Sequence, residues 1–191
     1  MSVPQQLIAL GIPEKCVQRL SSAEENRRRF SISPHTGDVI WRVHMDGCWL
    51  QSGDQKRVDY IFWCQSASGR SSVLLVELKG KHFGKALDQI EVTLQLLCKS
   101  AQGDVVHAAI KSNSPGHDPP ATGGVRAFVI LRKGENVPQV LTKRQRRQQK
   151  AGLSQALMKR RRLQMTYGVI VYPHSQELRI DGLDALPGQS Q

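Results

Sequence analysis

The chain has 191 residues and a mass of 21.3 kDa, which suits one domain and leaves too little for two independent hydrophobic cores. Its 39% apolar and 23% charged residues predict a globular chain and exclude collagen-like and disordered classes. The net charge of +11 indicates an anionic partner, and no apolar run approaches the roughly 20 residues that cross a bilayer, so no membrane association is expected.

The N-terminal part is predicted to form one helix followed by three strands. Helical spacing over residues 14–29 puts Val17, Leu20 and Glu24 on one face. Alternating or continuous apolar residues then predict strands over residues 39–45, 58–63 and 73–79. A polar turn separates the last two strands, so a hairpin is the simplest arrangement.

The C-terminal part is predicted to alternate helices and strands. A wide apolar arc predicts a covered helix over 84–99, and a strand follows at 125–131. Residues 142–163 predict a basic helix or a helix pair broken near Gly152, before strands at 167–172 and 177–180. The fold class is therefore α/β: a single domain over residues 1–186, with one mixed sheet flanked by helices and a disordered tail at 187–191.

The four cysteines, at positions 16, 48, 64 and 98, contain no C-x-x-C pair. Their spacing predicts neither a zinc site nor a disulfide framework, and reduced structural thiols are expected. The first ten residues lack the basic start and long apolar run of a secretion signal, so a cytoplasmic, intracellular location is expected.

Two acidic residues stand where apolar strands would carry other side chains. Asp59 lies within the strand predicted at 58–63, and Glu77 lies near the end of the next strand, two residues before Lys79. The simpler alternative is a strand that ends here with its charges in water. If Asp59 and Glu77 share a face of neighbouring strands, they form a two-carboxylate site for a hard divalent cation, Mg²⁺ or Mn²⁺. Lys79 would then orient the attacking hydroxide or stabilise the phosphate charge during phosphodiester hydrolysis.

Two further polar residues lie on faces predicted to be covered. Gln89, one turn after Lys85, falls inside the apolar arc of the helix at 84–99 and could bond a phosphate or a metal-bound water. Its alternatives are a cap to a sheet edge and an intrahelical bond. Glu24 is a candidate fourth member of the site, unless it pairs with Arg27 or Arg28 one turn on.

These residues resemble the PD-(D/E)XK nuclease superfamily, which includes restriction enzymes, junction resolvases and recombination nucleases. The resemblance rests on Glu24, on Lys56-Arg-Val-Asp-Tyr60, on Leu75-Val-Glu-Leu-Lys-Gly80 and on Ala86-Leu-Asp-Gln89, with Val58 where the motif names Pro. It implies a restriction-endonuclease-like core of a helix, a mixed sheet and a further helix. It also implies a catalytic set of Asp59, Glu77 and Lys79, a metal contact from the Leu78 carbonyl, and an accessory role for Gln89.

Nine lysines and arginines lie between residues 136 and 176 without one acidic residue. Such a run usually forms a helix face exposed to solvent, and its two clusters also have the spacing of a bipartite nuclear-import signal. Contact with a phosphate backbone explains the absence of acidic residues better than a solvent-exposed helix does. The residues expected to contact nucleic acid are Lys81, Lys85, Lys143, Arg144, Arg146, Arg147 and Lys150.

The leading hypothesis is a metal-dependent nuclease, with DNA favoured over RNA as its substrate. The alternatives are a nucleic-acid-binding module that kept the fold and lost catalysis, and a basic protein-interaction or regulatory domain. The sequence does not decide between endonuclease and exonuclease, between a monomer and a homodimer, or which sequence or structure is cut.

Overall fold

The computed structural model describes residues 4–49, 56–78, 83–99, 122–131, 143–183 and 186. Along this part of the chain the helical elements are α1 (Gln5–Ala9), the 3-10 helix η1 (Glu14–Cys16), α2 (Phe83–Lys99) and α4 (Lys143–Tyr167). The strands are β1 (Val17–Gln18), β2 (Ser22–Glu25), β3 (Arg28–Ser33), β4 (Val39–His44), β5 (Tyr60–Gln65), β6 (Ser71–Glu77), β7 (Thr122–Leu131), β8 (Ile170–Ser175) and β9 (Glu177–Asp181).

A six-stranded mixed sheet lies at the centre, in the order β1-β4-β5-β6-β7-β8 among the described strands. Strands β4, β5 and β6 form an antiparallel meander, which confirms the predicted hairpin. Helix α2 then carries the chain to β7, which is parallel to β6, and β8 is parallel to β7. The α/β class with a mixed sheet flanked by two helices in a single domain is therefore confirmed.

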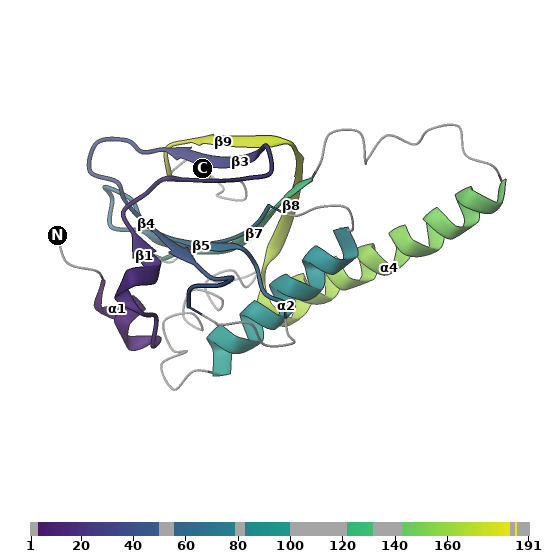
Figure 1. The fold of residues 1–191 in the computed structure, drawn as a ribbon, viewed down its shortest axis with the longest axis horizontal. Helices are drawn as coiled ribbons and strands as arrows, with labels where there is room; N and C mark the ends of the chain where they lie inside the picture. Colours follow the sequence, from purple (N-terminus) through teal and green to yellow (C-terminus); the bar gives the residue numbers. More distant parts are fainter. Residues whose placement is uncertain are drawn as a thin grey trace.

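The sheet is covered on both faces, which explains why β6 and β7 read as nearly continuous apolar runs. Helices α2 and α4 cover one face, and a smaller sheet in the order β2-β3-β9 covers the other (Figure 1). Alternate residues of each strand enter the two cores: Ile61 and Leu75 pack on the helix side, while Phe62 and Leu74 pack on the small-sheet side. Phe30 of β3 joins the small sheet to the large one through a ring contact with Phe62 at 5.1 Å.

The helix predicted over residues 14–29 is wrong. This segment contains η1, β1 and the β2–β3 hairpin, and Leu20, placed on the apolar face of the expected helix, is 43% exposed. The hairpin turns at Asn26 and Arg27, whose φ angles are 50° and 62°. A two-residue turn with both φ angles positive matches the twist of a β-hairpin, and asparagine tolerates this conformation well. Alternation through Phe30 and Ile32 then follows the strand period.

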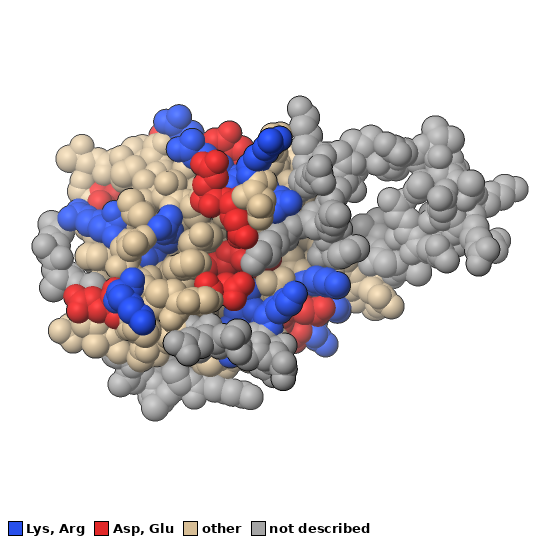
Figure 2. Space-filling model, viewed as in Figure 1, with Lys and Arg blue, Asp and Glu red and all other residues tan. Residues whose placement is uncertain are grey.

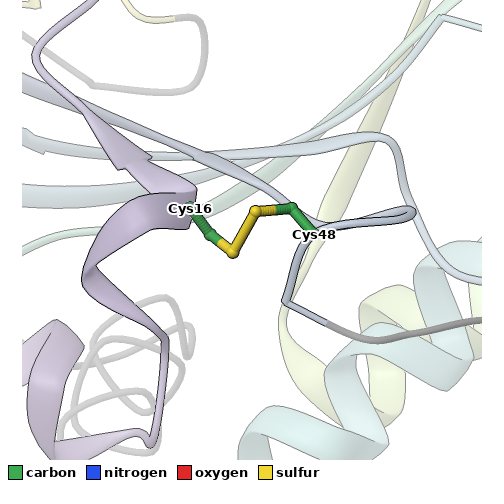
Figure 3. Close-up of a disulfide and its surroundings, with 2 residues drawn as sticks. All are labelled: Cys16 and Cys48. Carbon is green, nitrogen blue, oxygen red and sulfur yellow. A yellow bond between two sulfur atoms is a disulfide. The ribbon is translucent and has the colours of Figure 1, made fainter.

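The expectation of reduced thiols is wrong for one pair, because Cys16 and Cys48 form a disulfide with their Cα atoms 5.6 Å apart (Figure 3). The bond joins η1 to the segment after β4. Disulfides persist mainly in oxidising compartments, so this pair counts against the reducing location expected from the sequence. Cys64 and Cys98 are not part of a disulfide in the described residues. Burial raises the pKa of the Cys64 thiol, which is therefore a poor nucleophile.

Reduction of the Cys16–Cys48 bond is expected to lower the free energy of unfolding by about 3–4 kcal/mol. The reason is that the bond closes a loop across a sequence separation of 32 residues, which restricts the unfolded chain. Urea unfolding with and without a reductant measures the change. A Cys16→Ser/Cys48→Ser variant is the control, since the reductant should leave its unfolding midpoint in place. Equal midpoints for the oxidised and reduced wild-type protein would contradict the expected stabilisation.

The C-terminal elements follow the predicted order, with two differences. Strand β8 begins at Ile170 and not at residue 167, because Tyr167 still belongs to α4. Helix α4 runs without interruption from Lys143 to Tyr167, so the expected break near Gly152 does not occur. Leu186 is buried in the core on the small-sheet side, and the predicted disordered tail at 187–191 lies outside the described residues. No helix in the described ranges is long and apolar enough to span a membrane.

Candidate active site

The two carboxylates singled out in the sequence lie at the same end of the central sheet. Tyr60 of β5 pairs with Val76 of β6, so continuing this register by one residue puts Asp59 opposite Glu77. Residues directly opposite on antiparallel strands point to the same face, here the face covered by α2. Asp59 is 2% exposed and Glu77 is fully buried. The expectation that they share one face is therefore confirmed.

A backbone hydrogen bond fixes Asp59 beside Glu77. The amide N–H of Leu78, the residue after Glu77, donates to Asp59 Oδ2 over 2.7 Å. On the other side, the Met45 amide N–H donates to the Asp59 carbonyl at 3.0 Å. The carboxylate of Asp59 is thus tied to the end of β6 and its backbone to the end of β4, which leaves it little freedom to rotate away.

Gln89 of α2 faces this pair, as the helical pattern predicts. Its Nε2 donates to Glu77 Oε2 at 3.2 Å and to the Arg57 carbonyl at 2.6 Å. The amide therefore orients Glu77 and also holds the segment that leads into Asp59. The same pattern is wrong for Lys85, which is exposed at the first turn of α2 and not covered.

Thr93, one turn beyond Gln89, is a positioning residue that the sequence reasoning missed. Its Oγ1 accepts the amide N–H of Val58 at 3.1 Å and donates to the Gln89 carbonyl at 2.8 Å. Thr93 is fully buried. A threonine inside the apolar arc of α2, one turn from Gln89, was the available signal, because a buried hydroxyl needs a partner.

Arg28 is a second residue that the sequence reasoning missed. From the start of β3 its Nη1 donates to the Leu78 carbonyl at 2.7 Å. The backbone of Leu78 is therefore held at two points, by Asp59 at its N–H and by Arg28 at its carbonyl. The resemblance implies a metal contact from this same carbonyl. A carbonyl oxygen has two lone pairs, but a guanidinium beside it repels a cation.

Glu24 does not lie where the helical wheel puts it. In the β2–β3 hairpin Glu24 pairs with Arg29 and Glu25 pairs with Arg28. Because Arg28 reaches inward to Leu78, Glu25 shares the inner face and Glu24 the exposed one. The expectation that Glu24 lies on the site side of Glu25 is therefore wrong, since it assumed a helix.

Glu24 instead lines an open cleft of about 490 Å³ between the β2–β3 turn and the β8–β9 turn. The other lining residues are Arg27, Arg29, Ser175, Gln176 and Glu177. The cleft lies at the same sheet end as the carboxylates but on the small-sheet side, since β6, β7 and β8 are parallel and β8 ends at Ser175. Its two glutamates and two arginines balance, so the cleft itself shows no preference for an anion.

Two predicted site residues, Lys79 and Lys81, lie outside the part of the chain that the structure describes. Lys79 directly follows the Leu78 peptide that Asp59 and Arg28 hold. Its assignment as the catalytic lysine stays a prediction.

The nine bases lie along α4, and the N-terminal half of this helix extends beyond the sheet (Figure 1). The backbone of this half carries the predicted nucleic-acid contacts Lys143, Arg144, Arg146, Arg147 and Lys150. Bases in its C-terminal half instead pair with acids of α2: Lys159 Nζ lies 2.5 Å from Asp88 Oδ1, and Arg162 bonds Glu91. Part of the basic run therefore holds the two helices together.

The donor set at the end of the sheet fits a hard divalent cation. Two carboxylates supply oxygen ligands, which Mg²⁺ prefers, and Mg²⁺ sites commonly use one or two protein carboxylates with waters and substrate phosphates. Among the described residues, no group of three or more His, Cys, Asp and Glu side chains comes together as a metal site. Asp59 and Glu77 could therefore supply only part of the ligands of such a cation.

Comparison of the chain with protein-family models, with curated proteins and with solved structures found no match. The assignment of a function therefore rests on the residues and geometry described above.

Proposed function

We propose that the chain is a metal-dependent nuclease of the PD-(D/E)XK type. The observation that carries the proposal is the adjacency of Asp59 and Glu77 at the end of two central strands, with Gln89 bonded to Glu77. Burial of two acids without function is costly, because each must be compensated by hydrogen bonds or opposite charge. Buried acids grouped with a polar accessory residue are typical of a site built for chemistry.

The topology supports the proposal in part. The meander of β4, β5 and β6, the crossover through α2 and the parallel β7 provide the mixed sheet and the following helix that the resemblance implies. The helix expected over residues 14–29 is replaced by η1, β1 and the β2–β3 hairpin, and the short helix α1 precedes them. A restriction-endonuclease-like fold is therefore part of the proposal and would account for β4, β5, β6, α2 and β7.

In the proposed mechanism Asp59 and Glu77 would hold a divalent cation, which supplies Lewis-acid activation of the phosphate and of a water molecule. Asp59 is oriented by the Leu78 amide and Glu77 by Gln89, so neither carboxylate has to reorganise during the reaction. Lys79 would place its ammonium group next to the scissile phosphate and stabilise the charge that develops there.

Charge distribution supports a nucleic-acid substrate. Figure 2 shows a band of acidic side chains that runs from the β3–β9 side toward α2, with basic side chains on both sides. Basic side chains on either side of this band could contact the phosphates of a nucleic acid. The basic half of α4 would extend this contact along the backbone, and DNA is the favoured polymer.

Replacing Gln89 by Leu is expected to lower the cleavage rate by about 10- to 100-fold, the usual loss when a residue that orients a metal ligand is removed. Gln95→Leu is the matched control, because Gln95 lies on the exposed face of the same helix. Single-turnover cleavage rates and Mg²⁺ titrations measure the two variants. Equal rates for Gln89→Leu and Gln95→Leu would contradict the positioning role.

The proposal is tested with purified protein and a panel of plasmid, linear single strands, branched DNA and RNA. Each substrate is incubated with Mg²⁺, Mn²⁺ or a chelator. Cleavage of at least one polymer is expected with metal and not with chelator. If the protein binds nucleic acid but leaves every substrate intact under all conditions, it is a binding module and not a nuclease.

One observation favours that second candidate, a nucleic-acid-binding module without catalysis. The Arg28 guanidinium bonds the Leu78 carbonyl, which the resemblance assigns to the metal. The permanently charged guanidinium of Arg28 would take the place of a metal ion at this carbonyl. The basic surface would still be available to contact phosphates. Arg28→Gln separates the two cases: a nuclease should bind Mg²⁺ equally or more tightly in this variant, and a binding module should show no Mg²⁺ binding in either form.

A further inference from the structure

Three side chains form a layered stack at the end of β4 and β5. The rings of His44 and Tyr60, directly opposite in the register, lie 5.1 Å apart with an angle of 17° between their planes. The guanidinium carbon of Arg42, two residues earlier on β4, lies 5.3 Å from the centre of the Tyr60 ring. A cation over an aromatic ring is attractive, and parallel rings at this spacing are in contact.

Hydrogen bonds from Arg42 hold the stack in place, and the stack ends in an exposed ring. Arg42 Nη1 donates to the Ser22 carbonyl at 2.7 Å, and its Nη2 donates to Gln18 Oε1. Tyr60 packs against the core on the small-sheet side. His44, in contrast, is exposed. A flat imidazole face is therefore presented at the surface on a support that is already ordered.

The stack lies next to the proposed catalytic carboxylates. Tyr60 directly follows Asp59, and its partner Val76 directly precedes Glu77. Because successive residues of a strand point to opposite faces, the stack and the carboxylates lie on opposite sides of the same strand ends. A nucleotide strand crossing this end of the sheet would meet both.

We propose that the His44–Tyr60 stack binds an unpaired base beside the phosphate to be cut. The proposal rests on the proposed nuclease function and deepens it, because it assigns the substrate class: nucleic acid with at least one unpaired nucleotide at the cleavage position. A base offers a flat π face whatever its identity, and stacking on aromatic side chains is the usual way in which proteins bind single strands without sequence preference. A fully paired duplex keeps its bases stacked on each other and cannot use this surface.

Binding measurements in chelator test the proposal without any need for cleavage. A fluorescently labelled single strand and a blunt-ended duplex of two fully complementary strands of the same length are titrated with wild type, His44→Ala and His44→Phe. We expect His44→Ala to weaken single-strand binding by about 5- to 100-fold, the range for loss of one stacked base, and His44→Phe to restore it. Duplex binding should stay the same in all three proteins.

His35→Ala is the matched control, because His35 is also an exposed imidazole, and its Nε2 lies 4.0 Å from Asp181 Oδ1, away from the stack. Single-strand affinity that is unchanged in His44→Ala would overturn the proposal, as would equal losses on single strand and duplex, which indicate a phosphate contact. Failure of His44→Phe to restore binding would overturn it too. If His44→Ala selectively loses single-strand binding but the wild-type protein cleaves nothing, base stacking on His44 is supported and the nuclease function is refuted. If the wild-type protein cleaves with metal but His44→Ala binds single strands as well as wild type, the nuclease function is supported and base stacking on His44 is refuted.

Discussion

Replacing Asp59 by Asn or Glu77 by Gln is expected to abolish cleavage while nucleic-acid binding stays intact or tightens. Each change removes a proposed metal ligand and one negative charge near the phosphate. Loss of a residue that only orients a ligand lowers activity about 10- to 100-fold, so loss of the ligand itself should exceed about 100-fold. The new amide in Asp59→Asn can still accept the Leu78 N–H, and Gln89 can still bond the new amide in Glu77→Gln, so these isosteric changes preserve the local hydrogen bonds.

Glu14→Gln serves as the control for the loss of one charge, since Glu14 is exposed on η1. Cleavage and binding are measured for all variants together with thermal unfolding. Cleavage that persists in Asp59→Asn or Glu77→Gln would show that the wrong residues are assigned. Parallel loss of cleavage, binding and thermal stability would assign the two acids to the fold and not to the chemistry.

Neutralising Arg144, Arg146, Arg147 and Lys150 together is expected to weaken binding to all nucleic acids about equally. Each phosphate contact on duplex DNA contributes roughly 0.9 to the slope of log affinity against log salt, so the four changes should flatten that slope by up to about 3.6. Cleavage of a short substrate at saturating concentration should persist, because the carboxylates lie at the ends of β5 and β6 and not on α4. Titrations at several salt concentrations measure the slope.

The same helix supplies a control for the basic segment. Lys159→Gln/Arg162→Gln removes charges that already pair with Asp88 and Glu91, so it should change the salt slope less than the four N-terminal changes do. An unchanged slope and an unchanged affinity in the fourfold variant would contradict nucleic-acid binding by this segment. The run would then serve a partner protein or solubility.

The carboxylate pair could be predicted because it violates the local pattern of its strands. An acid at position 59 beside an otherwise apolar strand, and another at 77 after a Val/Leu run, are costly unless they meet a partner. Gln89 was found for the same reason, as a polar residue in an apolar arc. The central strands were predictable as well, because burial on both faces of the sheet requires continuous apolar runs. Helix α2 was predictable from its wide apolar arc.

The N-terminal segment could not be predicted because its short apolar spacing fits a helix and a hairpin equally well. The deciding signal was the turn at Asn26 and Arg27, which hydrophobic periodicity does not register. The disulfide and the bond from Arg28 to Leu78 join residues separated by 32 and 50 positions. Such long-range pairs depend on the packing of the small sheet and the N-terminal segment against the large sheet, and spacing in a single sequence contains no record of them.

Calorimetric titration of the metal-free protein with Mn²⁺ tests the central claim most directly, because it measures the site before any substrate is involved. The account predicts saturable Mn²⁺ binding by the wild-type protein and by Glu14→Gln, and loss of that binding in both Asp59→Asn and Glu77→Gln. Mn²⁺ binding of equal strength in all four proteins, or none in the wild type, would contradict it.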